Sequence, residues 1–180
     1  CKDKSKMNWD EEFKKMRRWL RTNYYLQNRE WVYKDIKPRI ICEKYLEEKE
    51  VEELRDYKFY CFDGEPKLVE VDFDRFNSHK RNLYDLDWNF LNLSIDYPND
   101  RKNIIDKPKH LSEMIEICKN LSMGFPHVRV DLYYVNYNII FGELTFFHKS
   151  GMAKFQPEEF EIKMGSWINL HNDSIKEESK

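Results

Sequence analysis

The stretch RVDLYYVNYNIIFGELTFF, residues 129–147, reads as two apolar, aromatic strands folded back on each other. Each arm carries one carboxylate, Asp131 in the first and Glu143 in the second. A three-residue turn at 136–138 would place the two carboxylates directly opposite each other, whereas a two-residue turn would put them on opposite faces. Like charges directly opposite one another destabilise a sheet unless something neutralises them. The turn therefore decides whether this hairpin presents an acid pair.

The three-residue turn would also gather other side chains beside that pair. It would place Arg129 opposite Thr145, and Tyr133 and Phe141 on the same face. A divalent cation would neutralise the two acids, and Mg²⁺ that bridges phosphates commonly uses one or two carboxylates. The alternatives are that both acids face solvent or that Arg129 forms an ion pair close to Asp131. Spacing alone leaves these alternatives open.

The segments around this hairpin indicate an α+β protein with a largely antiparallel sheet and flanking helices. The clearest signal is a second hairpin at 57–73, where Asp63 and Gly64 form the turn. The other expected elements are a helix from Asn8 to about residue 21, a strand at 39–46, a short strand pair within 81–93, a loop at 94–109, a helix at 111–122 and a last helix from Pro157.

Composition excludes several classes of function. The 180 residues are 41% hydrophobic, enough for one sizeable core, and 31 basic residues against 33 acidic ones give no broad electrostatic case for nucleic acid or an anionic membrane. No apolar run approaches the roughly 20 residues of a transmembrane segment. The polar N-terminal residues do not resemble a signal peptide, so we expect a cytoplasmic protein.

Catalytic and metal motifs are sparse. The four cysteines form no Cys-x-x-Cys pair, and we expect Cys42, Cys61 and Cys118 to be reduced core thiols. The five histidines lack metal-ligand spacing, and the five glycines are isolated, so the chain contains no glycine-rich phosphate loop. Three weaker features remain: Lys58 beside Asp56 on a strand, the basic cluster HKRN at 79–82, and the acidic, aromatic exit EKYL at 43–46. Each is more often a solvated surface when taken alone.

Taken together and in this order, the segments resemble the TupA-like ATP-grasp family. The resemblance rests on WLRTNYY, REWVYKDIKPRIICEKYLEE, DYKFYCFDGEPK, VDFDRFNSHKRNLYD, FPHVRVDLYYVN and IIFGELTFFHKSG, which cover most of residues 14–155. It implies an ATP-dependent carboxylate–amine ligase that acts through an acyl phosphate in bacterial cell-surface polysaccharide or polymer synthesis. Its substrates would be small-molecule or polymer carboxylates and amines, including a cell-surface glycan precursor.

The resemblance also implies roles for individual residues. Asp131 and Glu143 match the two carboxylates that hold Mg²⁺ on the ATP phosphates, and Arg129 matches the arginine that stabilises the acyl phosphate. Thr145 falls where many members place an asparagine that completes the second metal site.

Other residues match the nucleotide side of the family site. Lys58 sits where related ligases place a basic residue near the transferred phosphate, and Arg81 and Asn82 resemble their later arginine–asparagine pair. For the adenine the resemblance implies Glu43, Tyr45 and Leu46, and for the ribose it implies Glu47, Glu48 or Glu50.

The resemblance further implies how the chain is divided. Residues 1–38 match the remainder of the ATP-clamping subdomain, and residues 39–180 match the C-terminal metal- and nucleotide-binding subdomain. Members have an N-terminal region with a lysine- and glycine-rich loop before this stretch, so we expect this chain to be the C-terminal portion of a longer enzyme. Two alternatives are a non-catalytic glycan-binding module and a glycosyltransferase, for which the Asp-x-Asp patterns at 72–74 and 85–87 offer a weak signal.

Overall fold

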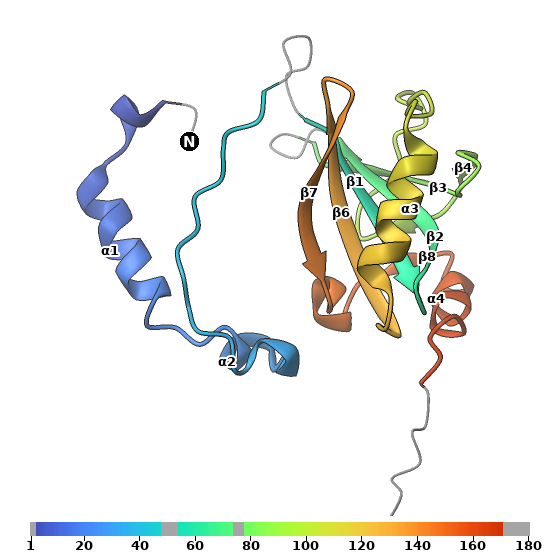
Figure 1. Ribbon diagram of the computed structural model, residues 1–180. Coiled ribbons are helices and arrows are strands. Elements are labelled where there is room, and N and C mark those ends of the chain that lie inside the picture. Colours follow the sequence, from blue (N-terminus) through green and yellow to red (C-terminus); the bar gives the residue numbers. More distant parts are fainter. Residues whose placement is uncertain (1–2, 48–53, 74–77, 171–180) are drawn as a thin grey trace, which may run out of the picture.

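The computed structural model describes residues 3–47, 54–73 and 78–170, and it confirms the α+β class (Figure 1). Its centre is a six-stranded antiparallel sheet in the order β4-β3-β2-β1-β6-β7. The strands are β1 (Asp56–Phe62), β2 (Glu65–Phe73), β3 (Lys80–Tyr84), β4 (Phe90–Leu91), β6 (His127–Val135) and β7 (Asn138–Thr145). A separate pair is formed by β5 (Ser94–Ile95) and β8 (Phe155–Gln156).

The helices flank this sheet and extend to one side of it. They are α1 (Trp9–Trp19), α2 (Tyr25–Asn28), α3 (Leu111–Ser122) and α4 (Glu159–Gly165), with 3₁₀ turns η1 (Lys4–Lys6), η2 (Trp31–Tyr33) and η3 (His148–Gly151). The helix expected at 111–122 is confirmed. Asn8 caps α1 as expected, because its side chain accepts a hydrogen bond from the amide of Glu11. The last helix begins two residues after Pro157.

The first face of the sheet is apolar and is covered by α3 (Figure 1). Apolar residues alternate along β1, β2 and β6 with a period of two, so one set points at the helix. The buried cluster consists of Tyr57, Phe59, Cys61, Val69, Val71, Tyr84, Val128, Val130 and Leu132 from the sheet, Leu111, Met114 and Cys118 from α3, and Ile105. The expectation of buried thiols is confirmed for Cys61 and Cys118.

The second face is apolar at one end and charged at the other. At the apolar end, α4 and the β5–β8 pair cover a smaller cluster that includes Tyr60, Phe62 and Leu83. The remaining positions of the same face carry buried charged side chains instead, namely Asp56, Lys58, Glu70, Asp72, Arg81, Arg129 and Asp131. We call these seven residues the charged face. A charged set of this size is expensive to bury, so its internal pairing decides whether the fold tolerates it.

The hairpin formed by β6 and β7 turns over two residues, not three. Asn136 and Tyr137 both have positive φ, 49° and 63°, and Val135 pairs with Asn138. A two-residue turn would put the two acids on opposite faces, but a bulge corrects the register. The ladder shifts between residues 131 and 132, and Gly142 is the extra residue on β7.

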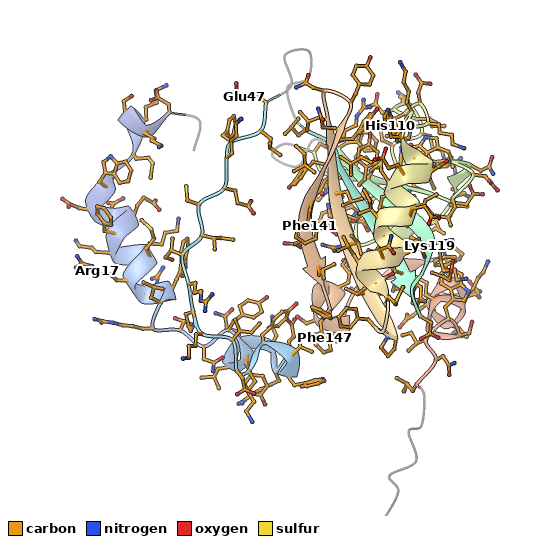
Figure 2. All side chains as sticks on the ribbon, in the orientation of Figure 1. Arg17, Glu47, His110, Lys119, Phe141 and Phe147 are labelled. Carbon is orange, nitrogen blue, oxygen red and sulfur yellow. The ribbon has the colours of Figure 1, made fainter. Side chains whose placement is uncertain are left out.

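The outcome of that bulge is that Asp131 pairs with Glu143, and Arg129 with Thr145, as a three-residue turn would have required. The expectation that Tyr133 and Phe141 share this arrangement is wrong. Beyond the bulge Tyr133 pairs with Ile140, and Phe141 pairs with Leu132. Phe141 is 53% exposed on the outer strand (Figure 2).

Two further expectations are corrected in the segment before the sheet. The strand expected at 39–46 does not form. All of these residues are described, they have no regular secondary structure, and Ile41 is 77% exposed. Strand composition is insufficient here because the segment pairs with no described strand. Cys42 is exposed, not a core thiol.

The N-terminal elements contact the sheet near the end of β7. The hydroxyl of Tyr33 accepts a hydrogen bond from the amide of Phe146 at 3.5 Å, and their rings meet edge to face. The hydroxyl of Ser150 donates to the carboxylate of Glu30 at 2.6 Å. No described helix is both long enough and apolar enough to cross a membrane.

Candidate functional site

Four side chains of β6 and β7 meet at one point on the charged side of the sheet. The Nε and Nη2 atoms of Arg129 donate to the two carboxylate oxygens of Asp131, each at 2.7 Å. The same Nη2 lies 3.2 Å from Oε1 of Glu143 and 3.0 Å from the hydroxyl of Thr145. That hydroxyl donates to Glu143 at 2.7 Å. Arg129, Asp131, Glu143 and Thr145 therefore form one cluster, which we call the β6–β7 cluster.

A second group lies beside it on β1, β2 and β3. The ammonium group of Lys58 is 2.6 Å from a carboxylate oxygen of Asp56 and 2.8 Å from one of Asp72. The Nε atom of Arg81 is 2.7 Å from Asp72 and 3.0 Å from Glu70. The register places Lys58 opposite Asp131 on one side and opposite Glu70 on the other. Strands β1, β3 and β6 thus bring Lys58, Arg81 and Arg129 onto the same face of the sheet.

Burial and pairing set the protonation of these groups. Burial opposes the charged form of Asp72, but its bonds to Arg81 and Lys58 outweigh burial and hold its pKa well below the usual range. Burial likewise opposes the charge on Arg129, yet its pKa is raised because Asp131 holds the proton in place. For Asp131 burial dominates over the attraction of Arg129, which raises its pKa to about 6.

An acid and a histidine that face each other across Tyr60 complete the interior of this face. Burial raises the pKa of Glu70, although Arg81 opposes the shift, and the hydroxyl of Tyr60 donates to Glu70 at 2.7 Å. Both ring nitrogens of His148 lie 3.3 Å from that hydroxyl. Burial, followed by the charges of Arg129 and Arg81, lowers the pKa of His148 to about 3. His148 is therefore neutral at physiological pH.

Asn82 does not join Arg81 on the charged face. Adjacent residues of a strand point to opposite faces, and Asn82 is fully buried on the other one. Its amide donates to the carbonyls of Asp100 and Asn103 at 2.9 and 3.2 Å, and its oxygen accepts from the amide of Asp100 at 2.8 Å. These bonds hold the loop after β5. A role of Asn82 in binding nucleotide remains a prediction.

The residues expected around adenine lie in the extended segment before the sheet. Glu43 and Tyr45 are exposed and Leu46 is half-buried. Glu47 lies at the end of this segment (Figure 2), while Glu48 and Glu50 lie outside the described residues. The structure does not bring this segment onto the charged face, so the adenine and ribose assignments stay predictions, as does the division of the chain at residue 38.

The donor set of the β6–β7 cluster fits a magnesium ion that is shared with phosphate. Among the described residues, no group of three or more His, Cys, Asp or Glu side chains is placed to hold a metal alone. The carboxylates of Asp131 and Glu143 and the hydroxyl of Thr145 nevertheless all lie within 3.2 Å of Nη2 of Arg129, and their oxygen atoms are hard ligands. Mg²⁺ typically takes one or two carboxylates and completes its coordination shell with water and phosphate. The charged face together with Glu143 carries five acids and three bases, so it has an excess of negative charge when all are ionised.

Several residues of the site were not among those expected at an ATP site. Glu70 and Asp72 alternate with apolar residues along β2, and Tyr60 and His148 contact the same network. The turn at Asp63 and Gly64 alone would set Lys58 opposite Val69. A register shift between Tyr60 and Cys61 instead brings Glu70 opposite Lys58, so counting from the turn does not find the two acids.

Comparison with known families identifies the family of the chain. A family model described as TupA-like ATPgrasp matches residues 1–169 of the chain. Comparison with curated proteins and with solved structures gives no match. Because the family model covers nearly the whole chain, the protein belongs to the TupA-like ATP-grasp family.

Proposed function

We propose that the charged face binds Mg²⁺-ATP and that the protein supports ATP-dependent joining of a carboxylate to an amine. The observation that carries the proposal is the bulge at Gly142, which sets Asp131 opposite Glu143 beside Arg129 and Thr145. A bulge next to a cluster of charges is a recurring way to aim side chains at a ligand. The proposed setting is the synthesis of bacterial cell-surface polymers.

Each residue of the site has a role that follows from its charge. Asp131, Glu143 and Thr145 would hold Mg²⁺, which when bound neutralises charge on the transferring phosphoryl group. Lys58 and Arg81 offer two buried cations for phosphate oxygens, and Lys58 faces Asp131 directly across the ladder. Phosphoryl transfer needs mainly positioning and charge neutralisation, so no nucleophilic side chain is required.

The proposed reaction has two steps. A substrate carboxylate takes the terminal phosphoryl group of ATP and becomes an acyl phosphate, with ADP as the leaving group. An amine then attacks the acyl carbon, releases phosphate and loses a proton. The hydroxyl of Tyr60 donates to Glu70 and lies 3.3 Å from the ring nitrogens of neutral His148, so two uncharged polar groups stand beside the charged side chains.

The experiment that tests the reaction is trapping with hydroxylamine. Hydroxylamine attacks an acyl phosphate to give a hydroxamate, so candidate carboxylates are incubated with the protein, ATP and Mg²⁺ and assayed for hydroxamate and ADP in equal amounts. We expect both products from the right carboxylate and neither from Asp131→Asn. ADP release without any hydroxamate would contradict ligation.

A glycosyltransferase gains no support from the Asp-x-Asp patterns. Asp72 is held by Lys58 and Arg81 inside the charged face, and Asp74 lies outside the described residues. Asp85 accepts hydrogen bonds from the backbone and side chain of Asn89 in an exposed turn. Consumption of a nucleotide sugar without ADP formation would revive this alternative.

A glycan-binding role has one favourable observation. A cavity of about 920 Å³ lies among α1, α2 and the segment after η2, and its lining includes Trp19, Tyr24 and Tyr33 with polar neighbours such as Gln27 and Asp35. Aromatic rings with nearby hydrogen-bonding groups suit a sugar ring. Quenching of tryptophan fluorescence by a glycan that is abolished in Trp19→Ala would support this second role, and unchanged quenching would remove it.

A further inference from the structure

Arg129 already contacts every oxygen-bearing side chain that we assign to the metal. Its guanidinium reaches both oxygens of Asp131, Oε1 of Glu143 and the hydroxyl of Thr145 within 3.2 Å. The side chains of Arg129 and Asp131 are buried, with 9% and 5% of their surface exposed, so their contact is not that of a loose surface pair, whereas the side chain of Glu143 is 63% exposed. A bidentate arginine–carboxylate pair in such surroundings has a defined geometry.

A divalent cation and this guanidinium compete for the same place. Both are positive, and their repulsion at contact distance in a partly buried site is much larger than in water. A single nitrogen atom of Arg129 contacts both Asp131 and Glu143. A metal ion that binds both carboxylates would therefore use the same oxygen lone pairs that now accept hydrogen bonds from Arg129. Metal binding at this pair therefore requires Arg129 to move.

We propose that Arg129 is the resident counter-ion of the acid pair, and that a divalent cation displaces it and thereby frees its guanidinium for an anion. The inference rests on the proposed function and adds an order of events at that site. Without metal, Arg129 keeps two opposed carboxylates from destabilising the β6–β7 ladder. With metal, the acids are neutralised by the ion, and the released guanidinium remains on the charged face, where Arg129 pairs across the ladder with Tyr60.

Two opposite effects follow for Arg129→Met, which keeps an unbranched side chain and removes the charge. Mn²⁺ alone should bind this variant at least about tenfold more tightly than the wild type, because the competing cation is gone. A non-hydrolysable ATP analogue with Mg²⁺ should bind about tenfold more weakly, because one cation for the phosphates is lost. A residue that only maintains the fold would weaken both.

The matched control is Lys80→Met, which removes the same charge from a strand that β2 and β1 separate from β6. Lys80 lies on β3 and pairs with Asp100 at 3.3 Å, away from the acid pair. We expect it to leave Mn²⁺ affinity within about twofold of the wild type, since partly exposed charges at a distance are screened. Mn²⁺ affinity is measured on the full chain by electron paramagnetic resonance, and nucleotide affinity by titration calorimetry.

Folding of the variants is followed by thermal unfolding with and without Mn²⁺. Arg129→Met leaves Asp131 buried without its partner, so its melting temperature should fall without metal and recover with Mn²⁺ more than the wild type gains. If this variant is unfolded under both conditions, Arg129→Lys replaces it. A single ammonium group competes less well than a bidentate guanidinium, so this variant should bind Mn²⁺ more tightly than the wild type.

The outcomes separate the inference from the proposed function. Wild type that binds Mn²⁺ at the acid pair, together with arginine variants that bind it equally or more weakly, overturns the displacement and leaves the metal site standing. Wild type and all arginine variants without measurable Mn²⁺ binding overturn both. Tighter Mn²⁺ binding with weaker nucleotide binding is the result that the displacement predicts.

Discussion

Gly142→Ala tests whether the bulge is what brings Asp131 and Glu143 together. A Cβ atom added at Gly142 would lie 3.0 Å from the backbone oxygen of Asp131 and 3.2 Å from a ring carbon of Tyr133. The ring of Tyr133 is half-buried and can move, but the backbone oxygen belongs to the ladder itself. To reach an ordinary contact distance of 3.4 Å, the backbone of Asp131 must therefore move by about 0.4 Å, and the side chain of Asp131 is one of the proposed metal ligands.

The expected cost follows from this overlap. Overpacking of a well-ordered site typically lowers the free energy of unfolding by about 1–3 kcal/mol, and in a chain of this size each kcal/mol lowers the melting temperature by roughly 2–4 °C. Mn²⁺ affinity should fall by about tenfold, because misplacing the support of a ligand commonly costs that much. Thermal unfolding and Mn²⁺ titration on the same preparation measure the two effects.

The control is Gly165→Ala at the end of α4. No atom lies within 4 Å of a Cβ added there, so this change should leave Mn²⁺ binding unaltered and raise stability by up to about 1 kcal/mol. If Gly142→Ala melts and binds Mn²⁺ like the wild type, the bulge does not depend on glycine and the steric reasoning is wrong.

Three further variants probe the buried charges and the site boundaries. Lys58→Met leaves Asp56 and Asp72 without their shared cation, so urea unfolding should show a loss of about 3–5 kcal/mol, and an undiminished stability would refute the pairing. Glu70→Gln should be stabilising at neutral pH. Burial raises the pKa of Glu70, so its ionised form weakens the fold, and the advantage of the variant in urea titrations should grow as the pH rises above about 4, the ordinary pKa of a glutamate; a constant difference would contradict this sign. Asn82→Ala should cost about 2–3 kcal/mol of stability through lost loop bonds while leaving affinity for an ATP analogue unchanged, whereas a selective loss of affinity would restore its sequence-based role.

Local patterns were sufficient where one element determines its own form. The hairpin at 57–73 carries its turn residues and its alternation in adjacent positions, and the helix at 111–122 carries a continuous apolar stripe. Both are confirmed as expected. In each case the partner surface follows from the same alternation, because the apolar side chains of β1 and β2 need a cover and α3 provides it.

The sequence predicted the β6–β7 cluster only on the condition that the hairpin turn has three residues. The alternation of side chains along the strands, combined with a three-residue turn, gives the correct partners for Asp131 and Arg129, but the turn is wrong. The extra residue of a bulge reverses the alternation, and the hydrophobic pattern of the sequence does not show it. The one available trace is Gly142 itself, since an isolated glycine inside a strand often marks a bulge.

The expected strand at 39–46 failed for a non-local reason. The segment 39–46 has strand composition, but a strand forms only where a neighbour pairs with it, and sequence composition does not report the neighbour. The family resemblance names Arg81 and Asn82 as a pair. Adjacent residues of a strand point to opposite faces, so the two side chains are separated, and a role of Asn82 in nucleotide binding stays a prediction.

The most direct test of the central claim is Mg²⁺-dependent nucleotide binding. A non-hydrolysable ATP analogue is titrated into the full chain with and without Mg²⁺, for the wild type, for Asp131→Asn with Glu143→Gln, and for the control Glu113→Gln with Glu116→Gln. The control makes the same change in charge on α3, across the sheet from the charged face. Binding that requires Mg²⁺ in the wild type and in the control, and that falls by at least about a hundredfold in the acid-pair variant, is the predicted result. Equal, Mg²⁺-independent binding in all three proteins would contradict the assignment of the charged face as the ATP site.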